Sequence, residues 1–283
     1  MGHHYVPQQH LRRFAIDDGN PYVWMYDKVT RRFCKAGIAN VAQESGYYEP
    51  EVESALAEKI EGPAKFLIDK LLMREKIDDA ERDKLSLFFM IMMTRGPRRR
   101  AKLIEWYPGL LAKSISNIKA DICQSTTVES DSHRTQLRMD ELDRVGARFA
   151  TEMPQGIRVQ IRRPFYSKRT VECIRSMYWH VIPAPAGTCF ITSDTPAHCF
   201  EHLGVGNLES EFTITLSKNA ALIGENRQNL GIGYEKPQAH LTKEINRRIL
   251  SHAKRFVFSS QQENWIDIVS QKSVQYLSQI RWA

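Results

Sequence analysis

Histidines crowd the start of this 283-residue chain, in the run Met1-Gly2-His3-His4-Tyr5-Val6-Pro7-Gln8-Gln9-His10. Histidine titrates near neutral pH and is the commonest metal ligand in proteins. Neighbouring residues of an extended strand point to opposite faces, so His3 and His4 can share a metal only if the backbone is irregular. The alternative is that His4, Tyr5 and Gln8 hydrogen-bond into the core and fix the N-terminus.

Two glutamates, Glu53 and Glu61, form a second group of residues that could take part in chemistry. In a predicted helix they lie two turns apart and diverge by about 80° around its axis. Ala57 lies between them, and its small side chain leaves room for a partner. Glu58 has Lys59 beside it and is predicted to be solvated. We expect Glu53 and Glu61 to face a metal, a histidine or an arginine, with a solvated or structural face as the alternative.

The run Ser193-Asp194-Thr195-Pro196 follows a β-prone segment and places an acid where a strand ends. Loops at strand ends often carry reactive groups. Asp194 is therefore a candidate metal ligand or base, with Ser193 beside it as a candidate substrate contact. The favoured alternative is an Asx-turn, in which the carboxylate accepts hydrogen bonds from backbone N–H groups, and both roles can coexist.

Positive charge is concentrated in three segments of a chain whose net charge is +7, namely residues 95–102, 158–169 and 247–255. Arginine suits phosphate recognition, and this charge fits a nucleic-acid partner. Arg95 and Arg98 are the candidate phosphate contacts, together with Arg12 and Gln8 near the N-terminus. Because Arg95 follows an apolar helix, we also expect it to pair with a carboxylate. A solvated face is the ordinary alternative for such a run.

Composition and absent motifs exclude several classes of protein. The hydrophobic fraction of 42% predicts a folded core, and the longest apolar run, residues 87–93, is too short to span a bilayer. Five scattered cysteines argue against a disulfide framework or a zinc knuckle. We see no secretory signal, P-loop, dinucleotide fingerprint or serine-hydrolase elbow. We expect a cytoplasmic protein without a membrane partner.

Hydrophobic periodicity predicts the elements that must position these residues. Strands are expected at 22–26, with 33–41 as a partner, and at 178–182, 189–192, 212–216, 220–224 and 256–260. Helices are expected at 51–73, with a break or kink at Gly62-Pro63, and at 78–95, 107–122, 137–153, 168–177 and 242–255. The helix at 78–95 is apolar on nearly all sides from residue 85 onward and should be buried.

These elements predict an α+β fold, in which a helical middle segment precedes a β-rich C-terminal part that packs on the N-terminal strands. We expect a single domain over 1–283 with two subregions, 1–123 and 137–283. The polar, Ser/Thr-rich stretch 124–136 is the predicted loop between them.

Several motifs along the chain resemble one uncharacterised prokaryotic family, domain of unknown function 4238. The resemblance covers nearly the whole chain, and the opening motif is the most specific. Its elements, in chain order, are His3-His4-Tyr5-Val6-Pro7-Gln8, Leu11-Arg12-x-Phe14, Glu53-x-x-Leu56, Ile60-Glu61-Gly62, Arg95-x-Pro97-Arg98, Phe190-Ile191-Thr192-Ser193-Asp194-Thr195-Pro196, Leu216-Ser217-Lys218-Asn219 and Asn246. Gln9-His10 and Thr195 depart from the family pattern without removing a chemical group. The resemblance implies a shared fold and transfers no activity.

The polar motifs of this basic chain together predict a metal-dependent nuclease. His4, Glu53, Glu61 and Asp194 would be catalytic, and His3, His4, Glu61 and Asp194 would bind Mg²⁺ or Mn²⁺, which lowers the pKa of a bound water. The prokaryotic resemblance adds a role in phage defence as an expectation. The alternative is a non-catalytic module that binds nucleic acid or a protein, with the same polar residues forming a structural network.

Overall fold

The computed structural model describes residues 2–17, 19, 21–48, 50–125, 132–162, 166–200, 203–226 and 230–269. Its contacts divide the chain into two compact units. The first unit joins Met1–Arg98 to Pro164–Ala283, and the second is Arg99–Arg163. Among the described residues, no helix is both long and apolar enough to cross a membrane.

In the described part of the first unit, the strands form three sheets. The smallest pairs β1 (Gly2–His4) with β4 (Gln43–Ser45). The largest has the strand order β10 (Ile232–Tyr234), β5 (Tyr178–Pro183), β9 (Ala220–Glu225), β8 (Glu211–Ser217) and β7 (Ala197–Cys199). The third has the order β3 (Arg32–Gly37), β2 (Tyr22–Asp27), β11 (Phe256–Ser259) and β6 (Thr192–Ser193).

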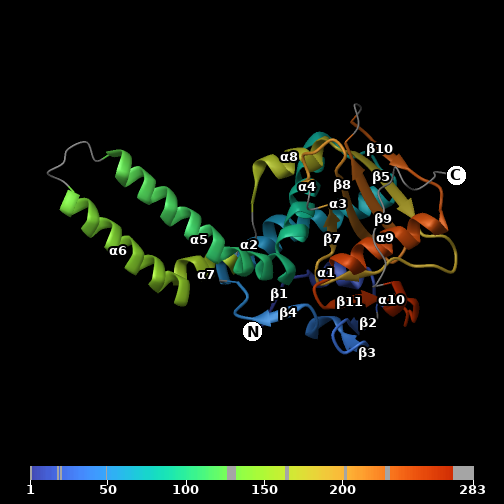
Figure 1. The fold of residues 1–283 in the computed structure, drawn as a ribbon. Coiled ribbons are helices and arrows are strands. Elements are labelled where there is room, and N and C mark those ends of the chain that lie inside the picture. Colours follow the sequence, from blue (N-terminus) through green and yellow to red (C-terminus); the bar gives the residue numbers. More distant parts are fainter. Residues whose placement is uncertain are drawn as a thin grey trace. The chain divides into compact units, whose positions relative to one another are not determined.

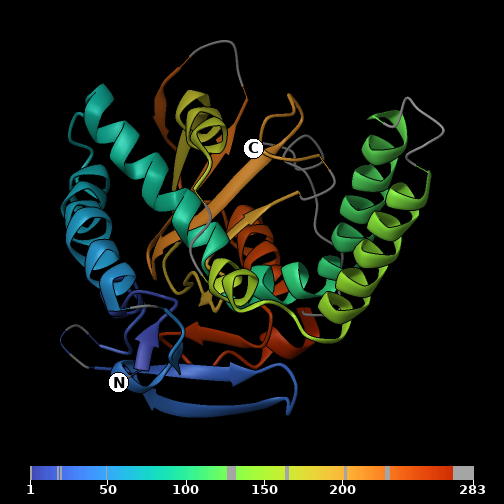
Figure 2. The ribbon, with the colours of Figure 1, turned by 90° about the vertical axis from the view of Figure 1, so that its left-hand side faces the viewer.

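Helix α4 (Asp79–Thr94) is the central helix of this unit, as its apolar sequence predicts. It begins at a capping box, in which Asp78 and Glu81 satisfy each other's backbone N–H groups. Most of its apolar residues are buried, and Phe89 packs against aromatic side chains of β5 and β8. Figure 2 shows α4 crossing one face of the largest sheet, beside α8 (Lys168–Ser176).

Helix α9 (Ala239–His252) covers the other face of that sheet (Figure 2). Alternate residues of β8 point to opposite faces, so its apolar residues meet α4 while its polar residues meet α9. Arg248 of α9 is fully buried there and contacts Glu211 at 2.7 Å and the hydroxyl of Thr213 at 3.0 Å. The interface between α9 and the sheet is therefore polar at β8, whereas Leu241 and Ile245 of α9 lie in an apolar cluster with residues of β5 and β9.

The third sheet joins strands from near both ends of the sequence (Figure 1). Strand β11 pairs antiparallel with β2 on one side and with β6 on the other. This pairing confirms the predicted α+β fold, with a β-rich C-terminal part packed on N-terminal strands. The predicted strand at 189–192 is shorter than expected, because Asn246 and Lys218 take the backbone N–H groups of Ile191 and Phe190.

The predicted helical region at 51–73 is one continuous helical stretch with a change of geometry in the middle. It consists of α2 (Pro50–Leu56), a π-helical turn (Ala57–Glu61) and α3 (Gly62–Leu72). The short elements of this unit are α1 (Gln8–Arg12), a 3₁₀ turn (Ile38–Asn40) and α10 (Trp265–Val269).

The second unit consists of helices in its described residues. Most of α5 (Pro97–Ser125) belongs to it, with α6 (Ser132–Thr151) and α7 (Gln155–Arg162). Lys119 and Asp143 join α5 to α6 at 2.6 Å. Helix α5 begins ten residues before the predicted start at 107, and α7 was not predicted. Residues 126–131 of the predicted loop lie outside the described residues, and the single-domain organisation stays a prediction.

Candidate functional site

The π-helical turn places Glu53 and Glu61 on the same side of their helix. A π-turn holds about one extra residue per turn, so eight residues cover nearly the rotation that seven cover in an α-helix. Their divergence therefore falls from about 80° to roughly 20°. Glu58, inside the turn, points to solvent and is exposed, as predicted. Such π-turns are frequent at functional sites.

Arg95 is the charged centre of the site, and its side chain is 1% exposed. It caps the C-terminal end of α4, and its guanidinium donates to Glu61 Oε1 at 2.5 Å and to the backbone carbonyl of His4. The hydroxyls of Tyr47 and Tyr48 donate to the Arg95 carbonyl at 2.9 and 3.3 Å. Arg95 thus pairs with a carboxylate, as expected. Its contacts join α4, the π-turn and β1.

His4 has one ring nitrogen engaged and one available. The ring hydrogen-bonds the backbone of Ala39, whereas Nε2 is buried without a hydrogen-bond partner among the described residues. The bond to Ala39 therefore belongs to Nδ1, which donates to a carbonyl and leaves the lone pair on Nε2. Burial lowers the pKa of His4, against the opposing effect of Glu53 and Glu61 nearby. The side chain is consequently a neutral base at neutral pH.

Glu53 shares this environment and also has an unsatisfied atom. Its Oε2 is buried and has no hydrogen-bond partner within the described part of the chain. The carboxylate lies near enough to His4 to act on its pKa. Both unsatisfied atoms are acceptors, and buried acceptors are normally satisfied. A water molecule can donate a hydrogen bond to an acceptor of either kind.

The four predicted metal ligands do not come together. His3 Nδ1 accepts a hydrogen bond from the backbone N–H of Tyr48 at 3.0 Å, and its ring stacks on Tyr48. Within the ranges that the structure describes, no three histidine, cysteine or acidic side chains are grouped so that they could hold a metal ion. The residues present therefore do not fit a metal centre built from His3, His4, Glu61 and Asp194. A requirement for Mg²⁺ or Mn²⁺ stays a prediction.

Asp194 is fully buried and accepts backbone hydrogen bonds from a distant segment of the chain. Its two oxygens accept the backbone N–H groups of Lys254, Arg255 and Phe256 at 2.7–2.9 Å. Burial raises the pKa of Asp194, and these three hydrogen bonds act against that shift. The carboxylate thus caps backbone N–H groups, as the alternative to a reactive role expected, but those of a segment about sixty residues further along the chain rather than those of its own turn.

Ser193 is also occupied within its own loop. Its hydroxyl donates to the Thr195 carbonyl at 2.8 Å and accepts the Thr195 N–H at 3.1 Å. The hydroxyl is fully buried, so the prediction of a substrate contact at Ser193 is not supported by its surroundings.

The other three predicted substrate contacts, Gln8, Arg12 and Arg98, differ in how far they are exposed. Gln8 is half-buried at the start of α1, and Arg12 is exposed at the end of that helix. Arg98 is half-buried and donates to the His252 carbonyl at 3.4 Å. Burial lowers the pKa of Arg98, while the nearby Asp194 raises it.

Three residues of the site were missed from the sequence. Tyr47 and Tyr48 hold Arg95, and burial raises the pKa of Tyr48 to about 12, so it stays a neutral donor. Gly96 follows Arg95, and a Cβ there would lie 2.7 Å from the Asp194 carbonyl oxygen. The sequence signals were the Tyr-Tyr pair before the acidic helix and the Arg-Gly-Pro after the apolar one. The Ser-Asp-Thr-Pro loop thus packs directly on the Arg95 segment.

Comparison with known proteins gives one match. No curated protein and no solved structure is similar to the chain at a significant level. A family model described as "Protein of unknown function (DUF4238)" matches residues 2–263, which include every site residue named above. The chain therefore belongs to the DUF4238 family of proteins of unknown function.

Proposed function

We propose that the protein is a hydrolase acting on nucleic acid, a nuclease in which His4 and Glu53 activate the attacking water. The observation that carries this proposal is the pair of buried, unsatisfied acceptors, His4 Nε2 and Glu53 Oε2. They lie beside the Arg95 cation in a half-buried site that includes a π-helical turn. Perturbed titratable groups gathered in this way are typical of active sites.

The residues allow a simple acid–base reaction. His4 accepts a proton from water through Nε2, while Glu53 accepts a hydrogen bond from the remaining O–H and so orients the oxygen. The water oxygen forms a bond to phosphorus, the bond from phosphorus to the leaving sugar oxygen breaks, and solvent protonates that oxygen. Burial keeps His4 neutral and able to accept the proton. Arg95 and Glu61 are positioning residues, because their contacts hold β1 against the π-turn.

The charge of the chain supports nucleic acid as the substrate. The net charge is +7, and Arg12 and Arg98 lie in the same unit as the site. Positive charge of this kind binds phosphate backbones independently of sequence. Gln8, Arg12 and Arg98 are the proposed substrate contacts, and a role in phage defence remains an expectation from the family resemblance.

The test is cleavage of labelled single-stranded DNA, duplex DNA and RNA by the purified protein, with Mg²⁺, Mn²⁺ or EDTA. We expect His4→Ala and Glu53→Gln to lower the rate by about 10²–10⁴-fold, the usual effect of losing an acid–base group. Glu58→Gln is the matched control, because it removes an exposed carboxylate from the same helical stretch and should leave the rate unchanged. Activity that persists in EDTA would separate this mechanism from a metal-dependent one.

A second candidate is the non-catalytic module, and one observation favours it. The Arg95 guanidinium and carbonyl are engaged by Glu61, Tyr47, Tyr48 and the His4 backbone, as in a structural network. Binding of DNA or RNA without cleavage under any metal condition, and unchanged in Glu53→Gln, would support this function instead.

A further inference from the structure

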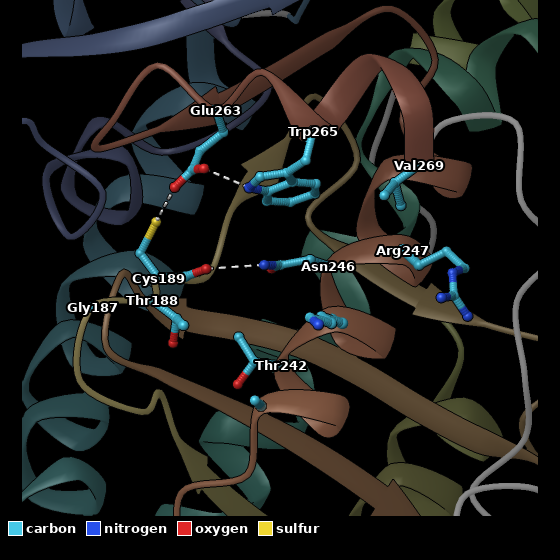
Figure 3. A pocket seen from close by; sticks show the side chains of 11 residues that line it. Gly187, Thr188, Cys189, Thr242, Asn246, Arg247, Glu263, Trp265 and Val269 are labelled. Atoms are coloured by element: carbon cyan, nitrogen blue, oxygen red, sulfur yellow. Dashed lines mark hydrogen bonds between the residues drawn. The ribbon is translucent and has the colours of Figure 1, made fainter.

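A separate pocket of about 490 Å³ opens beside the N-terminal half of α9. Figure 3 shows Glu263 and Trp265 on one side of it and Thr242 and Asn246 of α9 on the other. The loop at Gly187-Thr188-Cys189 forms a third side. The volume lies within the usual range of small-molecule sites, about 300–1,000 Å³. None of the residues proposed for nucleic-acid cleavage lines this pocket.

The pocket carries positive charge along α9. Lys243 and Arg247 both line it and lie four residues apart, hence on one face of the helix. Arg247 is paired with Glu244, whereas Lys243 is exposed and has no ion pair or hydrogen bond with any described residue. Ala239, in the first turn of α9, also lines the pocket, and the N-cap side chain makes no capping hydrogen bond. A helix N-terminus of this kind adds to the attraction for an anion.

The opposite side of the pocket offers an acceptor and a flat apolar surface. The Glu263 carboxylate accepts from the Trp265 indole N–H and contacts Cys189 Sγ at 3.4 Å. Burial raises the pKa of Cys189 to about 11, so its thiol keeps its proton at neutral pH. Each carboxylate oxygen can accept two hydrogen bonds, which leaves capacity for a donor on a ligand. The Trp265 ring, with Val269 beside it, provides a surface against which a planar group can pack.

A matching ligand must combine a planar body, N–H donors and an anionic group, in a size that fits the pocket. We propose that this pocket binds a mononucleotide, with the base against Trp265 and Glu263 and the phosphate at Lys243 and Arg247. Nucleotides have all three features in one molecule, whereas inorganic phosphate and nucleosides each lack part of them. The proposal does not depend on the cleavage proposed for His4 and Glu53.

The test is isothermal titration calorimetry of the full chain with AMP, GMP, CMP and UMP. We expect at least one to bind with a dissociation constant of about 1 mM or tighter. Lys243→Glu should weaken that binding by about 10-fold or more, because it removes a charge-assisted contact and adds a repulsive charge. Lys236→Glu is the matched control, since it makes the same charge change at an exposed lysine outside the pocket lining.

A second variant tests the pocket without altering its charge. Thr188 is exposed at the rim, so Thr188→Trp should fill the space and abolish binding while the protein stays folded. Equal binding of inorganic phosphate alone, equal loss in Lys236→Glu, or no binding of any nucleotide would each overturn the proposal. The His4→Ala variant should bind the nucleotide normally, so failure of the cleavage proposal and failure of this one are distinguishable.

Discussion

His10 should make the protein less stable in acid, and its own contribution can be measured. The side chain is 2% exposed, and its Nε2 hydrogen-bonds Thr192 Oγ1 at 3.0 Å. Burial, with the charges of Arg13 and Arg95, lowers the pKa of His10 from 6.5 to about 3 in the folded protein. The folded state therefore resists a proton that the unfolded chain takes up readily below pH 6.5.

The sign and size follow from this difference in proton binding. Because the unfolded chain binds more protons, the free energy of unfolding falls as the pH drops from about 6.5 toward 3. At about pH 5 the folded imidazole is still neutral, so the loss depends on the unfolded pKa and amounts to about 2 kcal/mol. Above about pH 7.5 the contribution of His10 to the pH dependence vanishes.

The assay is urea unfolding at about pH 7.5 and about pH 5. His10→Gln keeps a hydrogen-bonding nitrogen near Thr192 and does not titrate, so its stability should fall by about 2 kcal/mol less than that of the wild type over this interval. His240→Gln changes an exposed histidine and should leave the wild-type pH dependence intact. His198 and His4 also have lowered pKa values and remain in both variants. An identical pH dependence in His10→Gln and the wild type would refute the reasoning.

Two further substitutions test the contacts around the Ser-Asp-Thr-Pro loop. Asp194→Asn should lower the free energy of unfolding by about 3 kcal/mol, because an amide nitrogen would face backbone N–H groups that now have an acceptor; full stability with lost cleavage would instead indicate a catalytic Asp194. Gly96→Ala should cost about 1–3 kcal/mol in thermal or urea unfolding, because its Cβ would press on the Asp194 carbonyl. Gly109→Ala, in a helix with open space around it, should instead add about 0.5–1 kcal/mol.

Sequence signals predicted an element well where capping and helix-breaking residues mark both of its ends. Helix α4 was predicted at 78–95 and spans Asp79–Thr94, because Asp78 caps it and Gly96-Pro97 ends it. Segment 189–191 was predicted as a strand, yet its backbone bonds to Asn246 and Lys218, partners from distant parts of the chain. Propensity describes a residue's local preference, whereas strand formation depends on which groups hydrogen-bond to its backbone in the folded protein.

The same distinction between local sequence signals and distant partners explains which features of the site could be predicted. Residue types suggested His4, Glu53, Glu61 and Arg95, and the fold brings these four together from three segments. The π-turn that aligns the two glutamates leaves no trace in the helical period, so its effect could not be predicted. Asp194 was predicted both as an Asx-turn and as a reactive group, and the choice depended on three N–H groups about sixty residues away.

The unsatisfied atoms of the site bear on the choice between the two functions proposed for this protein. A structural network should leave no buried acceptor unpaired, since each one costs about 1–3 kcal/mol. The Arg95 carbonyl meets that expectation through Tyr47 and Tyr48, and its guanidinium donates to Glu61. His4 Nε2 and Glu53 Oε2 lie near it without a hydrogen-bond partner among the described residues, as does Arg95 Nε. Both of these acceptors, His4 Nε2 and Glu53 Oε2, belong to half-buried residues, so a donor arriving from solvent is the simplest group to complete them, and a bound water is also what hydrolysis requires.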